Sequence, residues 1–186
     1  MQNKTIKKIT VSALFIALSV VLSELIPSIE FPFGGSVTVF SMVPMCLLGI
    51  MFGTKWGVFA NLVYGAVQML FGLKNLSYAT SFIAAVVIIL FDYLVAYGGL
   101  GFSGIFSKKI NNKLVNIVVG VLFAVFLRYV CHFLTGVTVW REIAELPAAI
   151  WFSVTYNGGY MLPEMIITPI GAAILYKTNV LKRISN

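Results

Sequence analysis

Long runs of apolar residues without charges are the dominant feature of this sequence. Of its 186 residues, 60% are hydrophobic and only 10% are charged, and the mean hydropathy is +0.98. A soluble domain of this length could not bury so much apolar surface. A helix needs about 20 mostly apolar residues to cross the hydrocarbon core of a bilayer. These runs therefore predict an integral membrane protein whose solvent is largely lipid.

Charges and clusters of proline or glycine divide the apolar sequence into six segments. Their approximate ranges are 9–26, 37–53, 56–72, 79–104, 113–135 and 147–176. The fourth and the sixth are long, so we expect them to be tilted or kinked. The predicted fold is a single all-α membrane domain over residues 1–186, a bundle of six transmembrane helices.

The basic residues predict the orientation of this bundle, because basic loops are retained on the cytoplasmic side during insertion. If the N-terminus is inside, most of the 13 Lys and Arg residues fall on that side: Lys4, Lys7, Lys8, Lys55, Lys108, Lys109, Lys113, Lys177, Lys182 and Arg183. The carboxylates all fall in outer loops or within spans. An odd number of helices would destroy this segregation. We therefore predict that both termini are cytoplasmic.

The net charge of +7 is accordingly a topology signal. The cations are scattered over four inner segments and form no binding stripe, so no nucleic-acid partner is predicted. Cys46 and Cys131 lie in apolar spans without His or Cys partners at ligand spacing. Neither a disulfide nor a metal site is expected from them, and no cofactor is predicted.

The sequence does not predict a nucleotide-binding site of either common phosphate-binding type. A GxGxxG pattern is present at Gly99, Gly101 and Gly104. It ends a predicted membrane helix instead of joining a strand to a helix, so it does not predict a dinucleotide site. We expect these glycines to loosen the turn before the inner loop. No GxxxxGK[ST] loop is present, so ATP-driven transport would need another subunit.

Small residues four positions apart allow membrane helices to approach one another closely. One such row is Ala13 and Ala17 on the first predicted helix, and another is Gly49, Gly53 and Gly57 at the end of the second. For the glycines we predict packing within the bundle. The alanine pair alone does not distinguish packing within the bundle from contact with a partner.

Four ionisable side chains are predicted to lie inside the membrane, where charge is costly unless it is paired or hydrated: Asp92, Arg128, His132 and Glu164. Counted from the inner ends of their helices, Asp92, Arg128 and Glu164 lie about 20–22 Å along the bundle, and His132 lies one turn further toward the outer side. Arg128 and His132 are four residues apart and share a helix face. We predict that Arg128 forms a structural ion pair with Asp92 or Glu164, in preference to a direct ligand contact.

Aromatic and amide residues are concentrated near the same outer ends. They are Tyr64, Tyr93, Trp140, Trp151, Phe152, Tyr156, Asn157 and Tyr160. An aromatic belt at the lipid headgroups explains part of this set, but it does not explain a carboxylate beside Tyr93 or the amide of Asn157. A carboxylate, an imidazole and aromatic faces together suit a flat organic cation. We therefore predict an outward-facing pocket for such a ligand.

Four short motifs, spread over nearly the whole chain, resemble those of one known family. The most specific is a basic residue, His, Gly and Trp at intervals of four, from Arg128 to Trp140. The others are Ala13-x-x-x-Ala17, Phe91-Asp92-Tyr93-Leu94 and Tyr156-Asn157-Gly158. Together they are similar to the thiamine-specific substrate-binding subunit, or S component, of energy-coupling factor vitamin transporters.

This resemblance implies a six-helix protein of the bacterial plasma membrane that captures a vitamin at the outer side and has no ATPase activity. Through Ala13 and Ala17 it would dock onto a transmembrane coupling subunit that is carried by two cytoplasmic ATPase subunits. The ligand would be thiamine or a related cationic vitamin.

The motifs also imply roles for individual residues. Asp92 would neutralise or hydrogen-bond the cationic vitamin, and His132 and Trp140 would flank its rings. Asn157 would bind a polar edge, and Tyr93 would line the same pocket. By position in the sequence, Tyr64, Phe152 and Tyr156 complete the predicted binding set.

Some positions depart from the family pattern, and alternatives follow from them. Asp92 stands where some members carry Glu, and Phe152 stands where a tyrosine precedes the Asn by five residues. The first outer loop offers only Phe31 and Phe33 where some members carry a stacking Trp. An S component for another vitamin or a thiamine precursor therefore remains an alternative.

A second alternative comes from a different class of protein, an intramembrane enzyme. It would use Asp92, His132 and Glu164 as acid and base. The sequence contains no HExxH motif, no nucleophile elbow and no metal-ligand set to support it. We therefore predict a protein that is not an enzyme.

Overall fold

The computed structural model describes residues 2–141, 145–178 and 184, and most of them are helical. The predicted all-α class is therefore confirmed. Four helices are long and apolar enough to cross a membrane: Lys4–Leu25, Phe82–Gly104, Lys113–Val139 and Leu146–Lys177. They coincide with the first, fourth, fifth and sixth predicted segments.

Two of these four helices change their winding along their length. α1 (Gln2–Val20) continues into the π-helical turn η1 (Val21–Leu25), and it begins before residue 9 because its lysine-rich first turns are helical too. The fourth segment consists of α4 (Phe82–Val87), the π-helix η4 (Ile88–Val95), α5 (Ala96–Gly99) and the 3-10 helix η5 (Leu100–Gly104) in direct succession.

The predicted second helix is wrong at its start. α2 covers only Val43–Phe52, and residues 37–42 are not helical. Pro44 in the first turn favours a helix start there, because proline lacks the amide hydrogen that an interior position must donate. Phe40 adopts a left-handed backbone conformation with φ 62°. At 10 residues, α2 is about 15 Å long and too short to cross a bilayer alone.

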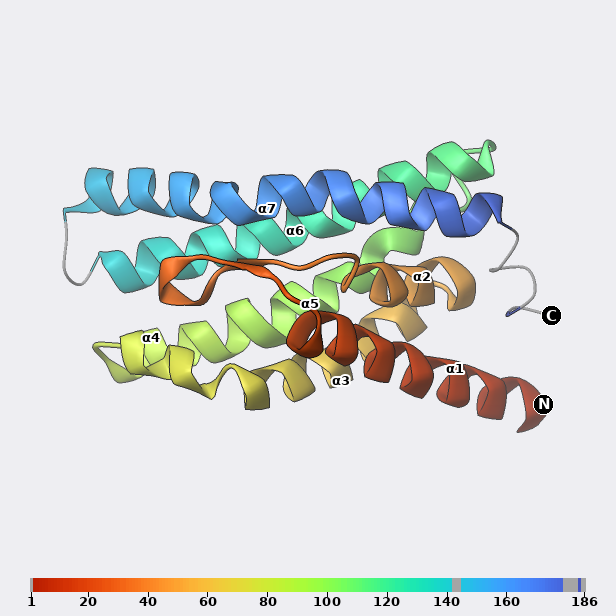
Figure 1. Cartoon of the computed structure of the whole chain (residues 1–186), viewed down its shortest axis with the longest axis horizontal. Helices are drawn as coiled ribbons and strands as arrows, with labels where there is room; N and C mark the ends of the chain where they lie inside the picture. Colours follow the sequence, from red (N-terminus) through yellow and green to blue (C-terminus); the bar gives the residue numbers. More distant parts are fainter. Residues whose placement is uncertain (1, 142–144, 179–183, 185–186) are drawn as a thin grey trace.

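The chain upstream of α2 forms a hairpin, which we call the 26–42 hairpin. Its strands β1 (Ile29–Glu30) and β2 (Ser36–Val37) pair antiparallel, and the short helix η2 (Pro32–Gly34) lies between them. The hairpin extends away from the end of the molecule where α1 begins and then returns to α2 (Figure 1). It therefore occupies the half of the molecule where we predicted the pocket.

The remaining helices complete the scaffold. α3 (Thr54–Phe71) matches the predicted third segment and is followed by the 3-10 helix η3 (Leu73–Tyr78). α6 (Lys113–Trp140) starts at a cap in which the Asn112 side chain accepts hydrogen bonds from two backbone amides. It runs beyond the predicted end at residue 135.

α7 (Leu146–Lys177) continues through Pro163 and Pro169 without a break. It lies beside α6 along the length of the molecule, and it ends where α1 begins (Figure 1).

Glycines allow α2, α3 and η5 to touch at the backbone. A Cβ at Gly49 would lie 2.4 Å from the carbonyl oxygen of Gly101, and one at Gly57 would lie 2.6 Å from the Gly49 Cα. A Cβ at Gly104 would lie 2.1 Å from the Gly49 oxygen. Packing within the bundle is therefore confirmed for Gly49 and Gly57. Gly101 and Gly104 of the GxGxxG pattern also serve this packing.

We expect Gly101→Ala to destabilise the protein. Its Cβ would lie 2.1 Å from the Val58 amide nitrogen and 2.4 Å from the Gly57 carbonyl carbon, and these backbone atoms of α3 leave little room for relaxation. Overpacking of this kind costs about 1–3 kcal/mol or more. The matched control is Gly99→Ala, whose Cβ would lie 3.7 Å from Leu127, an ordinary contact. Thermal unfolding in detergent should show a lower melting temperature for Gly101→Ala alone; equal melting temperatures would contradict the packing argument.

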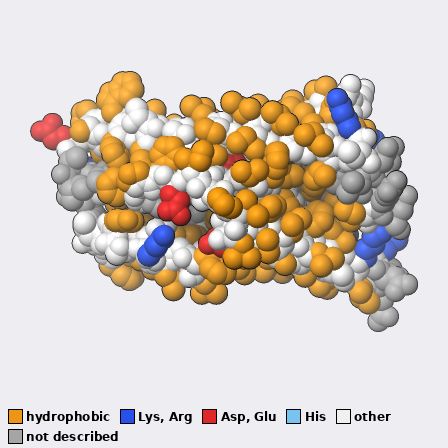
Figure 2. All heavy atoms as spheres, viewed as in Figure 1, with side chains coloured by type: hydrophobic (Ala, Val, Ile, Leu, Met, Phe, Trp, Pro, Cys, Tyr) orange, Lys and Arg blue, Asp and Glu red, His pale blue; other side chains and the backbone are white. Residues whose placement is uncertain are grey.

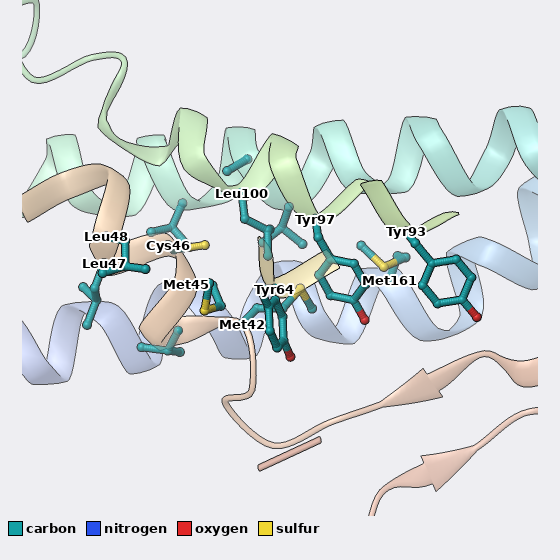
Figure 3. Close-up of a cluster of buried hydrophobic side chains, with 14 of the residues drawn as sticks. Met42, Met45, Cys46, Leu47, Leu48, Tyr64, Tyr93, Tyr97, Leu100 and Met161 are labelled. Atoms are coloured by element: carbon teal, nitrogen blue, oxygen red, sulfur yellow. The ribbon is translucent and has the colours of Figure 1, made fainter. Parts of the chain in front are cut away.

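The core becomes more polar along its length. Met45, Cys46, Leu47 and Leu48 are fully buried in α2, and Tyr64, Tyr93 and Tyr97 extend the cluster toward the hairpin. Figure 3 shows that the three tyrosine hydroxyl groups lie on the same side of this cluster. The core therefore supplies hydroxyl groups in the half of the molecule that contains the functional site.

Candidate functional site

A cavity of about 430 Å³ lies in the half of the molecule occupied by the 26–42 hairpin. It is lined by the hairpin and by residues of the first helix, α3, η3, η4, α5, α6 and α7. Its acidic lining residues are Glu24, Glu30, Asp92 and Glu164, and its lysine and arginine residues are Lys74 and Arg128. In a protein with a net charge of +7, this cavity concentrates most of the carboxylates.

The charges on the surface are separated in the same way. In the view of Figure 2, most basic side chains lie at the end where α1 begins, and acidic side chains lie in the middle and toward the opposite end. A cation approaching the cavity therefore meets a more negative surface than the net charge suggests.

The structure brings most of the predicted site residues to this one cavity. Asp92, Tyr93, His132, Tyr156 and Asn157 all line it, although they come from η4, α6 and α7. Arg128 and Glu164 line it as well. The sequence predicts that Asp92, Arg128, His132 and Glu164 lie at similar heights along the bundle, and this arrangement agrees with that prediction.

An aspartate and a histidine form the centre of the site. His132 Nδ1 lies 2.8 Å from Asp92 Oδ1, within hydrogen-bond distance. The His132 side chain is 10% exposed and that of Asp92 is 26% exposed. Asp92 therefore keeps access to the cavity while it contacts the imidazole.

The winding of η4 places Asp92 and Tyr93 beside each other on the cavity. Both lie in the π-helical stretch Ile88–Val95, and π-helical turns occur frequently at functional sites. The Tyr93 hydroxyl donates to the Gly72 carbonyl oxygen at 2.9 Å and accepts from the Asn75 amide at 3.0 Å. This hydroxyl holds η3 against η4, so Tyr93 offers the cavity its ring.

The predicted ion pair of Arg128 with Asp92 or Glu164 is wrong. Among the described residues, no nitrogen of Arg128 lies within 4.0 Å of either carboxylate. Arg128 Nε instead donates to His132 Nε2 at 3.0 Å, and its guanidinium carbon lies 4.0 Å from the centre of the Tyr97 ring. A ring face can replace a carboxylate as the partner of a guanidinium group.

Glu164 has a different set of partners, which explains why it does not need Arg128. It is only 1% exposed, and its Oε1 accepts from the Thr38 amide at 2.6 Å and from the Thr38 hydroxyl at 2.9 Å. Thr168 donates to Oε2 at 3.3 Å. Glu164 therefore joins α7 to the chain just after β2 and fixes the base of the hairpin.

Two predicted binding residues, Tyr64 and Phe152, are not among the described residues that line the cavity, and a third, Trp140, cannot be placed relative to it. Tyr64 is 1% exposed, and its hydroxyl accepts a hydrogen bond from Gln68, which does line the cavity. Phe152 stacks on Tyr156 with ring centres 5.5 Å apart and supports it from outside. Trp140 ends α6, and its side chain lies outside the described part of the structure.

Asn157 is positioned by several hydrogen bonds. Its amide nitrogen donates to the Ser153 carbonyl oxygen at 2.9 Å and to the His132 carbonyl oxygen at 3.2 Å. Its Oδ1 accepts from the Tyr160 hydroxyl at 2.6 Å. Asn157 thus links α7 to the backbone of α6 at His132.

Sequence reasoning left the aromatic wall of the hairpin and Tyr160 out of the predicted set. Phe31, Phe33 and Tyr160 all line the cavity. Tyr160 meets the His132 ring edge-on at 5.9 Å. The Tyr156 hydroxyl donates to the Pro32 carbonyl oxygen and accepts from the Gly35 amide at 2.9 Å. The Phe-Pro-Phe-Gly-Gly stretch between two apolar segments is the sequence signal that could have indicated this wall.

Comparisons with known proteins cover nearly the whole chain. Residues 9–183 match the model of a family described as thiamine transporter protein (Thia_YuaJ). The chain is 32% identical over 188 residues to the thiamine transporter ThiT of Bacillus subtilis (strain 168), across 95% of this chain and 94% of that protein. It is also similar to a solved structure of ThiT from Listeria monocytogenes, with a TM-score of 0.73, 26% identity and 98% of both chains covered.

Proposed function

This chain belongs to the thiamine transporter protein family (Thia_YuaJ), and from that premise we propose that its cavity binds thiamine from the outer side of the membrane. The family is one of transporters, so the chain is a transport protein and not an enzyme. The observation that carries the proposal is the Asp92–His132 pair on the wall of an aromatic cavity.

The chemistry of the cavity supports a flat, positively charged ligand. Its volume of about 430 Å³ falls within the range of small-molecule sites, which is about 300–1,000 Å³. Asp92 faces the cavity and can neutralise the thiazolium charge. The rings of Phe31, Tyr156 and Tyr160 can attract that charge with about 0.5–2 kcal/mol each.

The proposed topology has six transmembrane segments and two cytoplasmic termini. In support, α1 begins at the end of the molecule at which α7 finishes (Figure 1). α2 and α3 would be the second and third segments, and the 26–42 hairpin would complete the short second one toward the outer surface. The cavity would then open outward.

The transport step requires partners in this proposal. The chain would act as the S component of an energy-coupling factor importer and pass thiamine through a transmembrane coupling subunit carried by two ATPase subunits. Ala13 and Ala17 are both exposed on α1. The buried residues of this helix include Val11, Ser12 and Ser19. This exposure favours contact with a partner over packing within the bundle.

The purified protein should bind thiamine saturably with a 1:1 stoichiometry. The measurement is equilibrium quenching of the intrinsic fluorescence of its Trp residues, of which there are 3, with isothermal calorimetry as an independent check. A panel with an uncharged pyrimidine precursor and other vitamins tests the alternative of an S component for a different ligand. Saturable binding of another ligand from this panel, without binding of thiamine, would overturn the substrate assignment. Chemical turnover of any ligand would revive the enzyme alternative.

A further inference from the structure

The hydrogen bonds around His132 define which of its nitrogens carries the proton. Arg128 Nε lies 3.0 Å from His132 Nε2. An arginine nitrogen can only donate, so Nε2 must offer a lone pair. A neutral imidazole with a lone pair on Nε2 has its hydrogen on Nδ1, and Nδ1 is the atom that lies 2.8 Å from Asp92 Oδ1. One arrangement therefore satisfies all three groups: Arg128 donates to His132 Nε2, and His132 Nδ1 donates to Asp92.

The two other protonation states fit these contacts poorly. With the hydrogen on Nε2 alone, the imidazole would direct an N–H group at the Arg128 N–H and a lone pair at the Asp92 carboxylate. A doubly protonated ring would keep the contact with Asp92 but would place two donors, both carrying positive charge, 3.0 Å apart. Each alternative therefore leaves an unfavourable contact in a largely buried place.

The Arg128 guanidinium lies against an aromatic ring of the core. Its guanidinium carbon lies 4.0 Å from the centre of the Tyr97 ring. Tyr97 meets the buried Tyr64 edge-on, with ring centres 4.9 Å apart, and Figure 3 shows these two rings side by side. The position of Nε relative to His132 is thus set by packing in the core, before any ligand enters.

We infer that Arg128 is a positioning residue that fixes His132 as the neutral Nδ1–H tautomer and thereby leaves Asp92 as a full anion for the ligand. A neutral imidazole donates a hydrogen bond to Asp92 without cancelling its charge. The other groups near His132 are Tyr160, which meets its ring, and Glu164, which shares the cavity and is held by Thr38. The role of the ligand in this inference rests on the proposed function.

The tautomer can be observed directly, because the chain contains a single histidine. The protein would be labelled with ¹⁵N-histidine, purified without a histidine tag and studied by NMR in the absence of ligand at neutral pH. The two ring nitrogens differ in their couplings to the carbon-bound ring protons. We expect a protonated Nδ1 and an unprotonated Nε2. A protonated Nε2, alone or together with Nδ1, would overturn the inference.

Substitutions of Arg128 distinguish a role in positioning His132 from a general structural role. In Arg128→Met we expect protonated Nε2 to appear and thiamine affinity to fall. Arg128→Lys keeps a hydrogen-bond donor and a positive charge, so it should partly restore both the unprotonated Nε2 and the thiamine affinity. The matched control is Arg141→Met on the exposed end of α6, which should leave both unchanged. If Arg128→Met shows the native nitrogen signals and native affinity, Arg128 does not set the tautomer.

The NMR measurement tests the tautomer independently of the proposed thiamine binding. The nitrogen signals of the ligand-free protein do not depend on thiamine. A protonated Nδ1 in a protein that fails to bind thiamine would reject the proposed ligand and support the tautomer. If Arg128→Met does not fold, the spectrum of the native protein and that of Arg128→Lys still test whether Arg128 fixes the Nδ1–H tautomer of His132.

Discussion

Asp92→Asn is expected to weaken thiamine binding by about 1.5–3 kcal/mol, which is roughly ten- to a hundredfold in Kd. The substitution removes the charge and retains the shape of the side chain. The Asn oxygen can still accept the hydrogen bond that His132 Nδ1 gives to Asp92 Oδ1 at 2.8 Å. The loss therefore reports the attraction between the carboxylate and the cationic ring, measured by calorimetry at fixed salt.

The matched control is Glu145→Gln, which also removes one negative charge. Glu145 is exposed at the start of α7 and is not among the residues that line the cavity. Its variant should bind thiamine as tightly as the native protein. The histidine ¹⁵N signals of Asp92→Asn should also stay native, which would show that the geometry is retained. Native affinity in Asp92→Asn would remove Asp92 from the ligand contacts.

The helices were largely predictable from the sequence, because lipid imposes a simple requirement on apolar segments. The failure at residues 37–42 has a local cause. Val37, Val39 and Phe40 are as apolar as a membrane helix requires. Hydropathy does not register that Pro44 starts the helix or that the Thr38 amide is bound by Glu164, a residue that lies 126 positions away.

The residues of the site were more predictable than their pairing. Their heights along straight helices correctly placed Asp92, Arg128, His132 and Glu164 at one cavity. Height does not define which way a side chain points, and the π-helical winding over Ile88–Val95 changes the direction of Asp92 relative to an α-helix. Counting charges then favoured Arg128 as the partner of a carboxylate, whereas the structure places His132 between Arg128 and Asp92.

The aromatic wall was missed because it depends on the 26–42 hairpin. Tyr156 fixes the tip of this hairpin through the Pro32 carbonyl and the Gly35 amide. Gly35 must be small, since a Cβ there would lie 2.6 Å from the Tyr160 ring. These contacts join positions more than 120 residues apart, and no periodicity in the sequence encodes them.

Ala13→Trp and Ala17→Trp are each expected to abolish thiamine uptake by cells and to leave thiamine binding by the purified protein nearly unchanged. Both alanines are exposed on α1, whereas the neighbouring Ser12 is buried and accepts a hydrogen bond from Trp56 at 3.0 Å. The indole would therefore extend into lipid or toward a partner, and would not disturb the bundle.

The two readouts separate docking from capture. Helices that meet through small residues approach too closely to admit a Trp side chain, so the coupling subunit would be displaced. Uptake would be measured in cells that contain the coupling subunit and its ATPases, and binding would be measured in detergent. Ala66→Trp is the matched control, because Ala66 is exposed on α3 and should tolerate the same bulk with both activities retained. A parallel loss of uptake and binding would show that the α1 alanines support the cavity, whereas full uptake would place the docking surface elsewhere on the protein.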